Sequence, residues 1–424
     1  MNKYILCFIF IVLSFKAVAT YIFIPMDDES QKNHLKAYGI AYKVLENGGE
    51  VYWLLNYKGG SFAFTHIPLL ERECKIRDVS YSVITNGEFE RIRLEIDDPE
   101  INMDVMKLEK APKVAVYTPE YDEKGEKIQP WDDAVTLALS YAEIPFDKIY
   151  DREVLEDKLV QYDWLHLHHE DFTGQYGKFY GSYRNARWYI DYQRNQEALA
   201  KSLGFSKVSK LKLAVVQKIK EFVGAGGFMF AMCSATDSYD IALAAQNTDI
   251  CDNMFDGDPM DPNAQQKLDF SQTFAFQNFT LVTNPFEYEF SSIDFNSRKV
   301  RPEDDYFTLF DFSAKWDPVP TMLTQNHTRI IKGFMGQTTT FERKFLKSGV
   351  LVMGELKSID ETRYIHGDYG MGFWTFYGGH DPEDYRHYVG DPPTDLVLHP
   401  NSPGYRLILN NILFPAARKK KHKT

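Results

Sequence analysis

The sequence predicts an α/β protein whose strands form a parallel sheet with helices on both faces. Short apolar runs of strand length alternate along the chain with longer segments whose apolar residues recur at helical spacing. This alternation is typical of βα units, which bury their apolar strands between two layers of helices. A chain of 424 residues indicates two domains or one elaborated domain.

Residues 1–19 are predicted to be a secretory signal peptide. Lys3 gives a basic start, residues 5–15 are almost wholly apolar, and Ala17-Val18-Ala19 matches an A-x-A cleavage site. The apolar core is too short to span a membrane, and no later stretch reaches 18 uninterrupted apolar residues. We therefore expect no membrane span, and a periplasmic or extracellular protein after cleavage.

The charge of the chain argues against nucleic acid as a partner. The formal net charge is −12, and removing residues 1–19, which hold two lysines and no acidic residue, makes it −14. The basic tail at residues 417–424 is a local exception and is interpreted as a solvated chain end.

Three cysteines follow the signal peptide, Cys74, Cys233 and Cys251, so at least one thiol stays unpaired and a Cys233–Cys251 disulfide is an open alternative.

Two strand–helix–strand units open the fold. The first, in an N-terminal α/β segment spanning residues 20–110, comprises a strand at 21–25, a helix over 30–47 ended by Gly48-Gly49, and a strand at 51–57. The second opens a domain spanning residues 111–416, with a strand at 113–117, a helix from about 132 and a strand at 146–150.

The rest of the second domain continues the series. A strand at 164–168 is followed by a helix over 208–223 that leads into the strand before Cys233. Residues 252–330 are rich in Asp, Asn, Pro, Phe and Gln and are predicted to be an insertion of loops and irregular strands. The last predicted elements are strands at 329–341, 349–356 and 372–377 and a helix at 405–414.

Cys233 carries the strongest local motif. An apolar run ends at this cysteine, with Ala231 two positions before it and Ala235 two positions after it. Small residues at these positions are typical of a sharp strand-to-helix turn that holds a nucleophile in a strained backbone conformation. The alternative is a buried structural cysteine at a strand end.

His380 is the predicted base for this nucleophile. It follows Gly378-Gly379 at the end of a strand, and Asp381 and Glu383 are nearby carboxylates that could orient it. A cysteine nucleophile needs such a base, and functional groups gather at the carboxyl ends of parallel strands. We therefore expect Cys233 as nucleophile, His380 as base, and Asp381 or Glu383 as its orienting group. The alternative for His380 is a loop histidine bonded to backbone.

A second cluster, His166-Leu167-His168-His169-Glu170-Asp171, ends the strand at 164–168. Imidazoles and carboxylates at this density suit zinc, but the chain has no H-E-x-x-H or other spaced ligand set. A polar strand end lining the same crevice as Cys233 is therefore favoured over a metal site, and no metal or cofactor is expected. The predicted substrate-binding residues are His168, His169, Glu170 and Ser234, and at least one of the first three should line that crevice.

Two further features support alternatives. Residues 256–263 place Asp at alternating positions without the EF-hand order, and are interpreted as an acidic surface loop with calcium binding as the alternative. Seven aromatic residues crowd one stretch and could stack on sugars or pack in the core: Trp164, Phe172, Tyr176, Phe179, Tyr180, Tyr183 and Trp188. They favour the alternative of a non-catalytic protein that binds a carbohydrate or peptide.

The strand–Cys–helix turn at Cys233, followed by the strand ending in Gly379-His380, resembles the class I glutamine amidotransferase-like superfamily, with closest likeness to its trehalose-utilisation (ThuA-like) branch. The resemblance covers roughly residues 112–416 outside the insertion and implies a flavodoxin-like sheet. It implies a thiol hydrolase acting on an amide or a sugar-derived substrate. Full amidotransferases place glycine beside the nucleophile and a His-x-Glu pair downstream, whereas this chain has Ala235, and Asp381 directly after His380.

The opening segment, from Ile24-Pro25-Met26-Asp27 to Gly59-Gly60-Ser61, also resembles exported bacterial proteins labelled asparagine synthetase B. Such a synthetase needs an N-terminal catalytic cysteine, whereas Thr20 follows the predicted cleavage site. It also needs an S-G-G-x-D-S pyrophosphate loop, and residues 234–238 lack the glycines. The residues therefore favour a hydrolase over the labelled activity.

Overall fold

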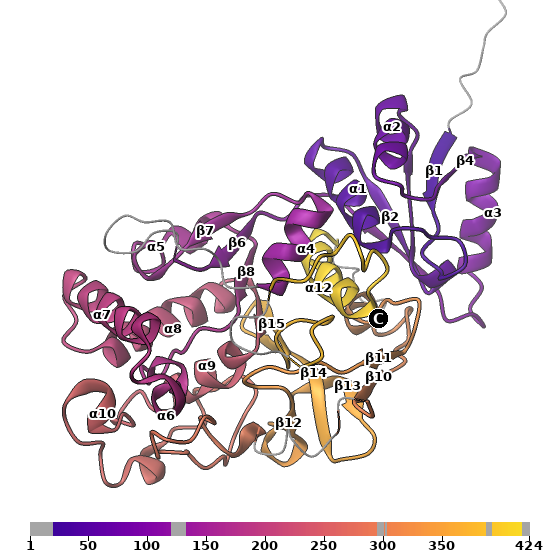
Figure 1. The fold of residues 1–424 in the computed structure, drawn as a ribbon. Helices are drawn as coiled ribbons and strands as arrows, with labels where there is room; N and C mark the ends of the chain where they lie inside the picture. The colour runs from indigo at the N-terminus through magenta and orange to yellow at the C-terminus, as the bar shows by residue number, and fades with distance from the viewer. Residues whose placement is uncertain (1–19, 120–132, 295–300, 302, 387–391, 418–424) are drawn as a thin grey trace, which may run out of the picture.

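The computed structural model describes residues 20–119, 133–294, 301, 303–386 and 392–417, which form two sheets and the helices around them (Figure 1). The predicted signal peptide at 1–19 and all of the predicted basic tail except Ala417 lie outside the described residues. Among the helices of the described ranges, none combines the length and the apolar character needed to cross a membrane.

The N-terminal unit is an antiparallel sheet in the order β4-β1-β3-β2-β5. Its strands are β1 (Thr20–Ile24), β2 (Val51–Leu55), β3 (Ser61–Thr65), β4 (Ser82–Thr85) and β5 (Asp104–Leu108). Its helices are α1 (His34–Glu46), α2 (Pro68–Ile76) and α3 (Asn86–Ile96). β3 lies between β1 and β2 and is antiparallel to both, so the first predicted strand–helix–strand unit is split by a third strand.

Local chemistry explains the limits of α1. The helix begins four residues later than predicted, because the Asn33 side chain accepts a hydrogen bond from the Lys36 N–H at 3.0 Å and caps the first turn. Gly48, with φ of 75°, follows the helix in the left-handed region that glycine adopts without strain.

The second sheet has ten strands and runs β11-β10-β13-β14-β15-β9-β8-β6-β7, with β12 paired to β14. Its strands are β6 (Val114–Tyr117), β7 (Asp147–Ile149), β8 (Trp164–Leu167), β9 (Phe228–Met232), β10 (Tyr306–Leu309), β11 (Ile330–Lys332), β12 (Phe341–Glu342), β13 (Leu351–Leu356), β14 (Glu361–Tyr369) and β15 (Gly372–Tyr377). The five strands from β7 to β15 are parallel, and the remaining strands are antiparallel. The prediction of a parallel sheet is therefore right for one half of this sheet and wrong for the other.

Two parts of the sequence prediction are corrected here. Strand β14 has no predicted counterpart, because it buries polar residues such as Thr362, Arg363 and His366 and so lacks the apolar pattern of a strand. The strand predicted over 329–341 is two short strands, β11 and β12, joined by a loop over 333–340. That loop makes its hydrogen bonds with the end of β15 and with buried carboxylates, so it cannot extend a sheet.

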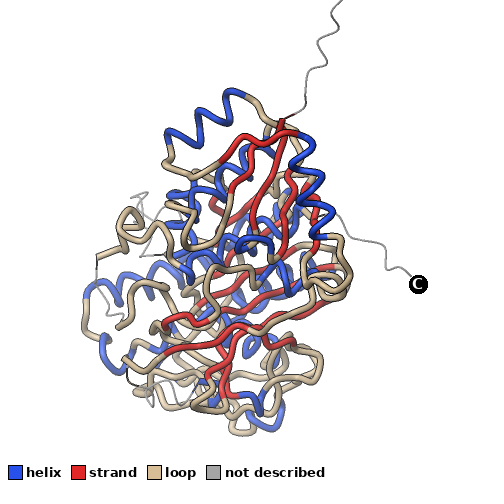
Figure 2. Tube along the Cα trace, turned by 90° about the vertical axis from the view of Figure 1, so that its right-hand side faces the viewer, coloured by secondary structure: helices blue, strands red, loops and turns tan. Residues whose placement is uncertain are grey.

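Helices cover both faces of the parallel half (Figures 1 and 2). The helices of this domain are α4 (Ala134–Ala142), α5 (Asp151–Leu155), α6 (Tyr180–Tyr183), α7 (Arg187–Ser202), α8 (Val208–Gly224), α9 (Ser234–Ala244), α10 (Asn253–Asp256), α11 (Pro318–Leu323) and α12 (Pro403–Leu413). Trp164, Phe230 and Tyr377 pack into one core with α4, α12 and the N-terminal unit. Their strand neighbours Leu165 and Met229 pack into a second core with α8 and α9.

A buried arginine joins the N-terminal unit to α12. Arg406 is fully buried, and its guanidinium donates to the Met26 carbonyl at 3.0 Å, to the Tyr38 hydroxyl at 3.1 Å and to the Gly59 carbonyl. Tyr38 in turn donates to the Asn410 side chain. Charge-assisted bonds of this kind fix the orientation of two packed elements, so α12 belongs to both units.

Candidate active site

The carboxyl ends of three neighbouring parallel strands bring the predicted site residues together. β8 pairs with β9 so that Leu167 lies opposite Ala231, and β15 pairs with β9 so that Tyr377 lies opposite Met232. His168, Cys233 and Gly378 each follow directly after one of these strands. The strand carrying Trp164 to Leu167 therefore neighbours the strand that ends just before Cys233.

Cys233 occupies a strained turn between β9 and α9. Its backbone has φ of 52° and ψ of −140°, a conformation that residues with a side chain rarely adopt. Two bonds to the neighbouring strand ends hold it. The Cys233 N–H donates to the Gly379 carbonyl at 3.1 Å, and the Ala235 N–H donates to the His168 carbonyl at 2.9 Å. Ala231 and Ala235 are fully buried, which explains why both positions need small residues.

Backbone N–H groups surround the thiol. The Gln337 N–H points at the Cys233 sulfur at 3.3 Å. Burial raises the pKa of this thiol, while the N–H groups of Gln337, Ser234 and Thr338 oppose that shift. Burial outweighs the donors, so the resting thiol is neutral and needs a base before it can act as a nucleophile.

The three described cysteines, Cys74, Cys233 and Cys251, are all free. Cys251 is fully buried, and its sulfur donates to the Thr173 carbonyl at 3.3 Å. The structure therefore does not adopt the Cys233–Cys251 disulfide that the sequence left open, and the nucleophile interpretation remains available.

The loop over 333–340 packs tightly against the end of β15. The Gly379 N–H donates to the Thr338 carbonyl and the His380 N–H donates to the Met335 carbonyl, both at 2.8 Å. A Cβ on Gly336 would lie 2.8 Å from the Gly379 carbonyl carbon, so only glycine fits there. The loop thus presents the Gln337 N–H to the thiol at a fixed position.

Two buried carboxyl groups hold this loop from behind. Asp237 accepts a hydrogen bond from the Thr338 hydroxyl at 2.8 Å, and Asp294 accepts from the Thr339 N–H. Burial raises the pKa of Asp237 to about 7 and that of Asp294 to about 8. Both groups therefore titrate near neutral pH, close to the thiol.

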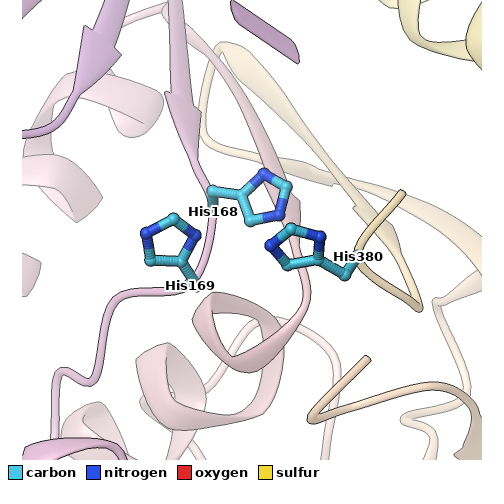
Figure 3. Close-up of side chains that lie close together, drawn as sticks. All are labelled: His168, His169 and His380. Atoms are coloured by element: carbon cyan, nitrogen blue, oxygen red, sulfur yellow. The ribbon is translucent and has the colours of Figure 1, made fainter. Parts of the chain in front are cut away.

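Three histidines converge from the ends of β8 and β15, the two strands that flank β9 (Figure 3). The ring centroids lie 4.5 Å apart for His168 and His380, 5.0 Å for His168 and His169, and 5.8 Å for His169 and His380. One nitrogen from each ring lies within 4.8 Å of the other two. His168 and His380 are buried, and His169 is partly exposed.

A buried carboxylate supports His168 from the other side. The Asp133 Oδ1 atom lies 3.2 Å from the Nδ1 atom of His168 and 3.2 Å from the Nε2 atom of His166. Burial alone would raise the pKa of Asp133, but the neighbouring imidazoles hold it well below its usual range, so this group is ionised. We call Asp133, His166, His168, His169 and His380 the histidine cluster.

Asp133 was not among the site residues predicted from the sequence. Its side chain accepts hydrogen bonds from the Val135 and Thr136 N–H groups and so caps α4. A helix was predicted from about residue 132, so the available signal was an Asp at the start of the helix that follows a parallel strand. Such a residue lies at the carboxyl edge of the sheet.

Glu170 belongs to a different cluster. Its carboxylate lies 3.4 Å from the Lys212 Nζ atom and accepts from the Tyr150 hydroxyl at 3.4 Å. The Lys212 ammonium also bonds both carboxylate oxygens of Asp151, at 3.1 and 3.2 Å, and the Tyr117 hydroxyl at 3.1 Å. We call these five residues the lysine cluster. The predicted role of Glu170 beside Cys233 therefore has no support from its contacts, because Lys212 holds its charge elsewhere.

Asp381 and Glu383, the two carboxylates predicted to orient His380, also bond to other groups. Asp381 is fully buried and accepts from the Glu383 N–H at 2.9 Å. Glu383 accepts from the Tyr385 hydroxyl at 2.7 Å and lies 3.2 Å from the His399 Nδ1 atom. These contacts turn both carboxylates to other partners than the His380 ring.

Ser234 stays next to the thiol. It is fully buried in the first turn of α9, and its hydroxyl has no hydrogen-bond partner among the residues that the structure describes.

The two features that supported alternatives have other contacts. In the acidic loop, Asp256 and Asp258 both bind the ammonium of Lys207, which supplies the positive charge that a calcium ion would. Trp164 and Phe172 are fully buried in the two cores. Phe179, Tyr183 and Trp188 contact one another, whereas the Tyr176 ring contacts Tyr192 and the Tyr180 ring contacts Phe255 and Phe286.

No family model and no curated protein matches the chain. Among solved structures, it is similar to the cytoplasmic protein STM3548 from Salmonella typhimurium, at 13% identity over 72% of this chain and 100% of that one, with a TM-score of 0.35. It is similar to the cytoplasmic protein STM1381 from Salmonella typhimurium LT2 at 10% identity, with the same coverage and TM-score. It also matches 28% of Gan42B, a GH42 β-galactosidase, at 12% identity over 64% of this chain, with a TM-score of 0.28. At TM-scores this low, the likeness identifies neither a shared fold nor a shared function.

Proposed function

We propose that the protein is an exported thiol hydrolase with an amidotransferase-like core, in which Cys233 attacks an amide or a sugar-derived carbonyl substrate. The observation that carries this proposal is the backbone of Cys233, held at a φ of 52° between a parallel strand and a helix. A structural cysteine has no need of that strain, whereas a nucleophile gains access to a substrate from it. The strand order β7-β6-β8-β9-β15 corresponds to the flavodoxin-like order 2-1-3-4-5, which supports the same family.

In the proposed reaction, a ring nitrogen of His380 takes the proton from the Cys233 thiol as the sulfur attacks the carbonyl carbon. The carbonyl oxygen becomes an oxyanion, which backbone N–H groups such as that of Gln337 stabilise. The amine then leaves with the proton held by His380, and a water molecule hydrolyses the resulting thioester. General base catalysis fits this site because burial keeps the resting thiol neutral.

The orienting carboxylate that the contacts favour is Asp133, acting through His168. The His168 ring packs 4.5 Å from that of His380, and Asp133 bonds the far side of His168. Asp381 and Glu383, the carboxylates expected from the sequence, accept hydrogen bonds from the Glu383 N–H and the Tyr385 hydroxyl.

The geometry favours hydrolysis over asparagine synthesis. The segment that faintly matches a pyrophosphate loop, residues 234–238, forms the first turns of α9 with every side chain buried. A pyrophosphate loop needs exposed backbone N–H groups, which these residues use within their helix and against neighbouring strands.

Thiol labelling tests the proposal. In a C74A/C251A background without residues 1–19, Cys233 is the remaining thiol, and we expect the folded protein to react with iodoacetamide. The rate should keep rising with pH through pH 9, because burial raises the pKa of Cys233 above its ordinary value of 9.0. On a panel of amide and ester substrates, C233A should lose roughly 10³-fold or more of any activity found. A folded protein whose Cys233 stays unmodified at every pH below unfolding would overturn the proposal.

A further inference from the structure

We propose that His168, His169 and His380 bind a divalent transition metal ion such as zinc, with Asp133 as the outer-sphere partner that orients His168. This inference stands on the histidine cluster alone and does not depend on the reactivity of Cys233. It also departs from the sequence-based expectation of a polar strand end without metal, because only the fold brings His380 to the other two rings.

The first support is the spacing of the nitrogen atoms. One nitrogen of each ring lies within 4.8 Å of the others. The centre of an equilateral triangle with that side is about 2.8 Å from each corner, so a shift of about 0.7 Å per nitrogen reaches the zinc–nitrogen distance of about 2.0–2.1 Å. Figure 3 shows the three rings facing a common space between the ends of β8 and β15. Small rotations of the side chains therefore complete the site.

The second support is the contact of His168 with a buried carboxylate. The Asp133 Oδ1 atom lies 3.2 Å from the Nδ1 atom of His168. The Nε2 atom of His168 lies on the opposite edge of the ring. A carboxylate that bonds the far nitrogen of a metal-binding histidine is the usual outer-sphere arrangement, since it fixes the ring and raises its basicity.

His166 adds to this arrangement from inside the sheet. Its Nδ1 atom donates to the Phe230 carbonyl at 3.1 Å, and its Nε2 atom lies 3.2 Å from Asp133. The ring is fully buried against β9. It therefore packs beside Asp133 and is not itself placed with the three proposed ligands.

The ligand set indicates the class of metal. Three neutral imidazoles suit zinc, cobalt, nickel and copper, whereas magnesium and calcium prefer oxygen ligands. His169 is partly exposed, so a fourth position is open to water or a substrate atom, as in catalytic zinc sites.

The group with ligand-like spacing outside the histidine cluster, Asp249, Cys251 and Asp256, lacks this character. The Lys207 ammonium lies 2.7 Å from Asp249 and 2.9 Å from Asp256. A lysine already compensates those carboxylates, and a cation would have to displace it. Within the described residues, the histidine cluster is therefore the better candidate.

A bound metal would compete with the thiol chemistry. A nitrogen of His380 that ligates a metal has no lone pair left to accept a proton from Cys233. We therefore expect the metal-bound protein to label more slowly at Cys233 than the metal-free protein. The two states would be alternative forms of one site.

Cobalt titration tests the site. The mature protein is stripped with EDTA and titrated with Co²⁺, whose visible absorption bands report tetrahedral nitrogen coordination. We expect one ion per chain, displaced by Zn²⁺, and a loss of affinity of about 100-fold or more in H169Q and H380Q. H169Q is the decisive variant because His169 is partly exposed and its replacement leaves the core packed. H399Q, a partly exposed histidine bound to Glu383, is the matched control and should bind cobalt as the unmodified protein does.

The outcomes separate this inference from the proposed function. C233S should keep cobalt affinity within about 3-fold, since the thiol is not a proposed ligand. If Cys233 is inert but H169Q and H380Q lose cobalt, the metal site stands and the hydrolase proposal fails. If the folded protein binds no Co²⁺ at millimolar concentration, or if H169Q and H380Q bind it unchanged, the metal site is overturned.

Discussion

The lysine cluster and the histidine cluster both include residues that follow β8, yet their buried carboxylates have different partners. In the lysine cluster, one ammonium contacts oxygens of Asp151, Glu170, Tyr117 and Tyr150 at 3.0 to 3.4 Å. These carboxylates raise the pKa of Lys212 despite its burial. The cluster is thus a closed ion network with a permanent cation.

The histidine cluster has no permanent cation among the residues that define it. Its one carboxylate, Asp133, is bonded by imidazoles, which can gain or lose a proton or lend a lone pair. We infer that a lysine paired with buried carboxylates stabilises the fold. Histidines around a buried carboxylate can still exchange a proton or bind a metal ion. Three changes test this difference.

The largest expected effect on stability comes from Lys212. K212M leaves Asp151 and Glu170 buried without their counter-charge, and we expect it to lower the free energy of unfolding by about 3–5 kcal/mol. Urea denaturation measures the loss. The control is K218M, which removes a partly exposed lysine paired with Asp157 and should cost under about 1 kcal/mol. A K212M protein as stable as K218M would mean that the lysine cluster is not the structural element described.

Replacing Asp133 should reduce cobalt affinity and have a smaller effect on stability. Asparagine caps helices as well as aspartate does, so D133N retains the α4 cap but removes the charge that fixes His168. We expect cobalt affinity to fall about 10- to 100-fold, or about 1.4–2.7 kcal/mol, with a smaller loss of stability than in K212M. D151N, in the lysine cluster, should leave cobalt affinity unchanged. Equal cobalt affinity in D133N and D151N would show that the histidine cluster affects metal binding no more than the lysine cluster does.

The smallest expected effect concerns Asp294, a buried carboxyl group outside both clusters. Its folded-state pKa, about 8, lies above the ordinary 3.8, so the stability that it contributes is complete below about pH 4 and is lost as the pH rises to 8. Between pH 6 and 7.5 the free energy of unfolding should therefore fall by about 1.4 kcal/mol per pH unit more in the unmodified protein than in D294N. Thermal and urea denaturation across this range measure the slope. The exposed D368N is the control, and identical slopes in all three proteins would show that Asp294 does not titrate there.

Local pattern was enough to predict the parallel half of the large sheet. The apolar runs at Val114–Tyr117, Trp164–Leu167 and Phe228–Met232 are strands as predicted, and the helical spacing over 208–223 matches α8. Cys233 could be singled out because the small residues Ala231 and Ala235 reflect a close approach of backbone that is encoded within five residues. His168 could be placed near it because neighbouring parallel strands end at one edge.

Contacts between distant segments decided the rest. The Gln337 N–H that faces the thiol lies 104 positions from Cys233, in a segment whose sequence predicted a strand. Asp133 lies 35 positions from His168, and its local sequence shows only a helix cap. Glu170 follows His169 directly, yet the ammonium of Lys212 draws its side chain into the other cluster.

The sequence by itself determined the strands and helices of the parallel half and which cysteine occupies a strained turn, because backbone propensity and side-chain size act over a few residues. The tertiary structure alone decided which carboxylate serves which base, and that three histidines meet. Those outcomes depend on sheet order and on the competition of buried charges for partners, which no local pattern records.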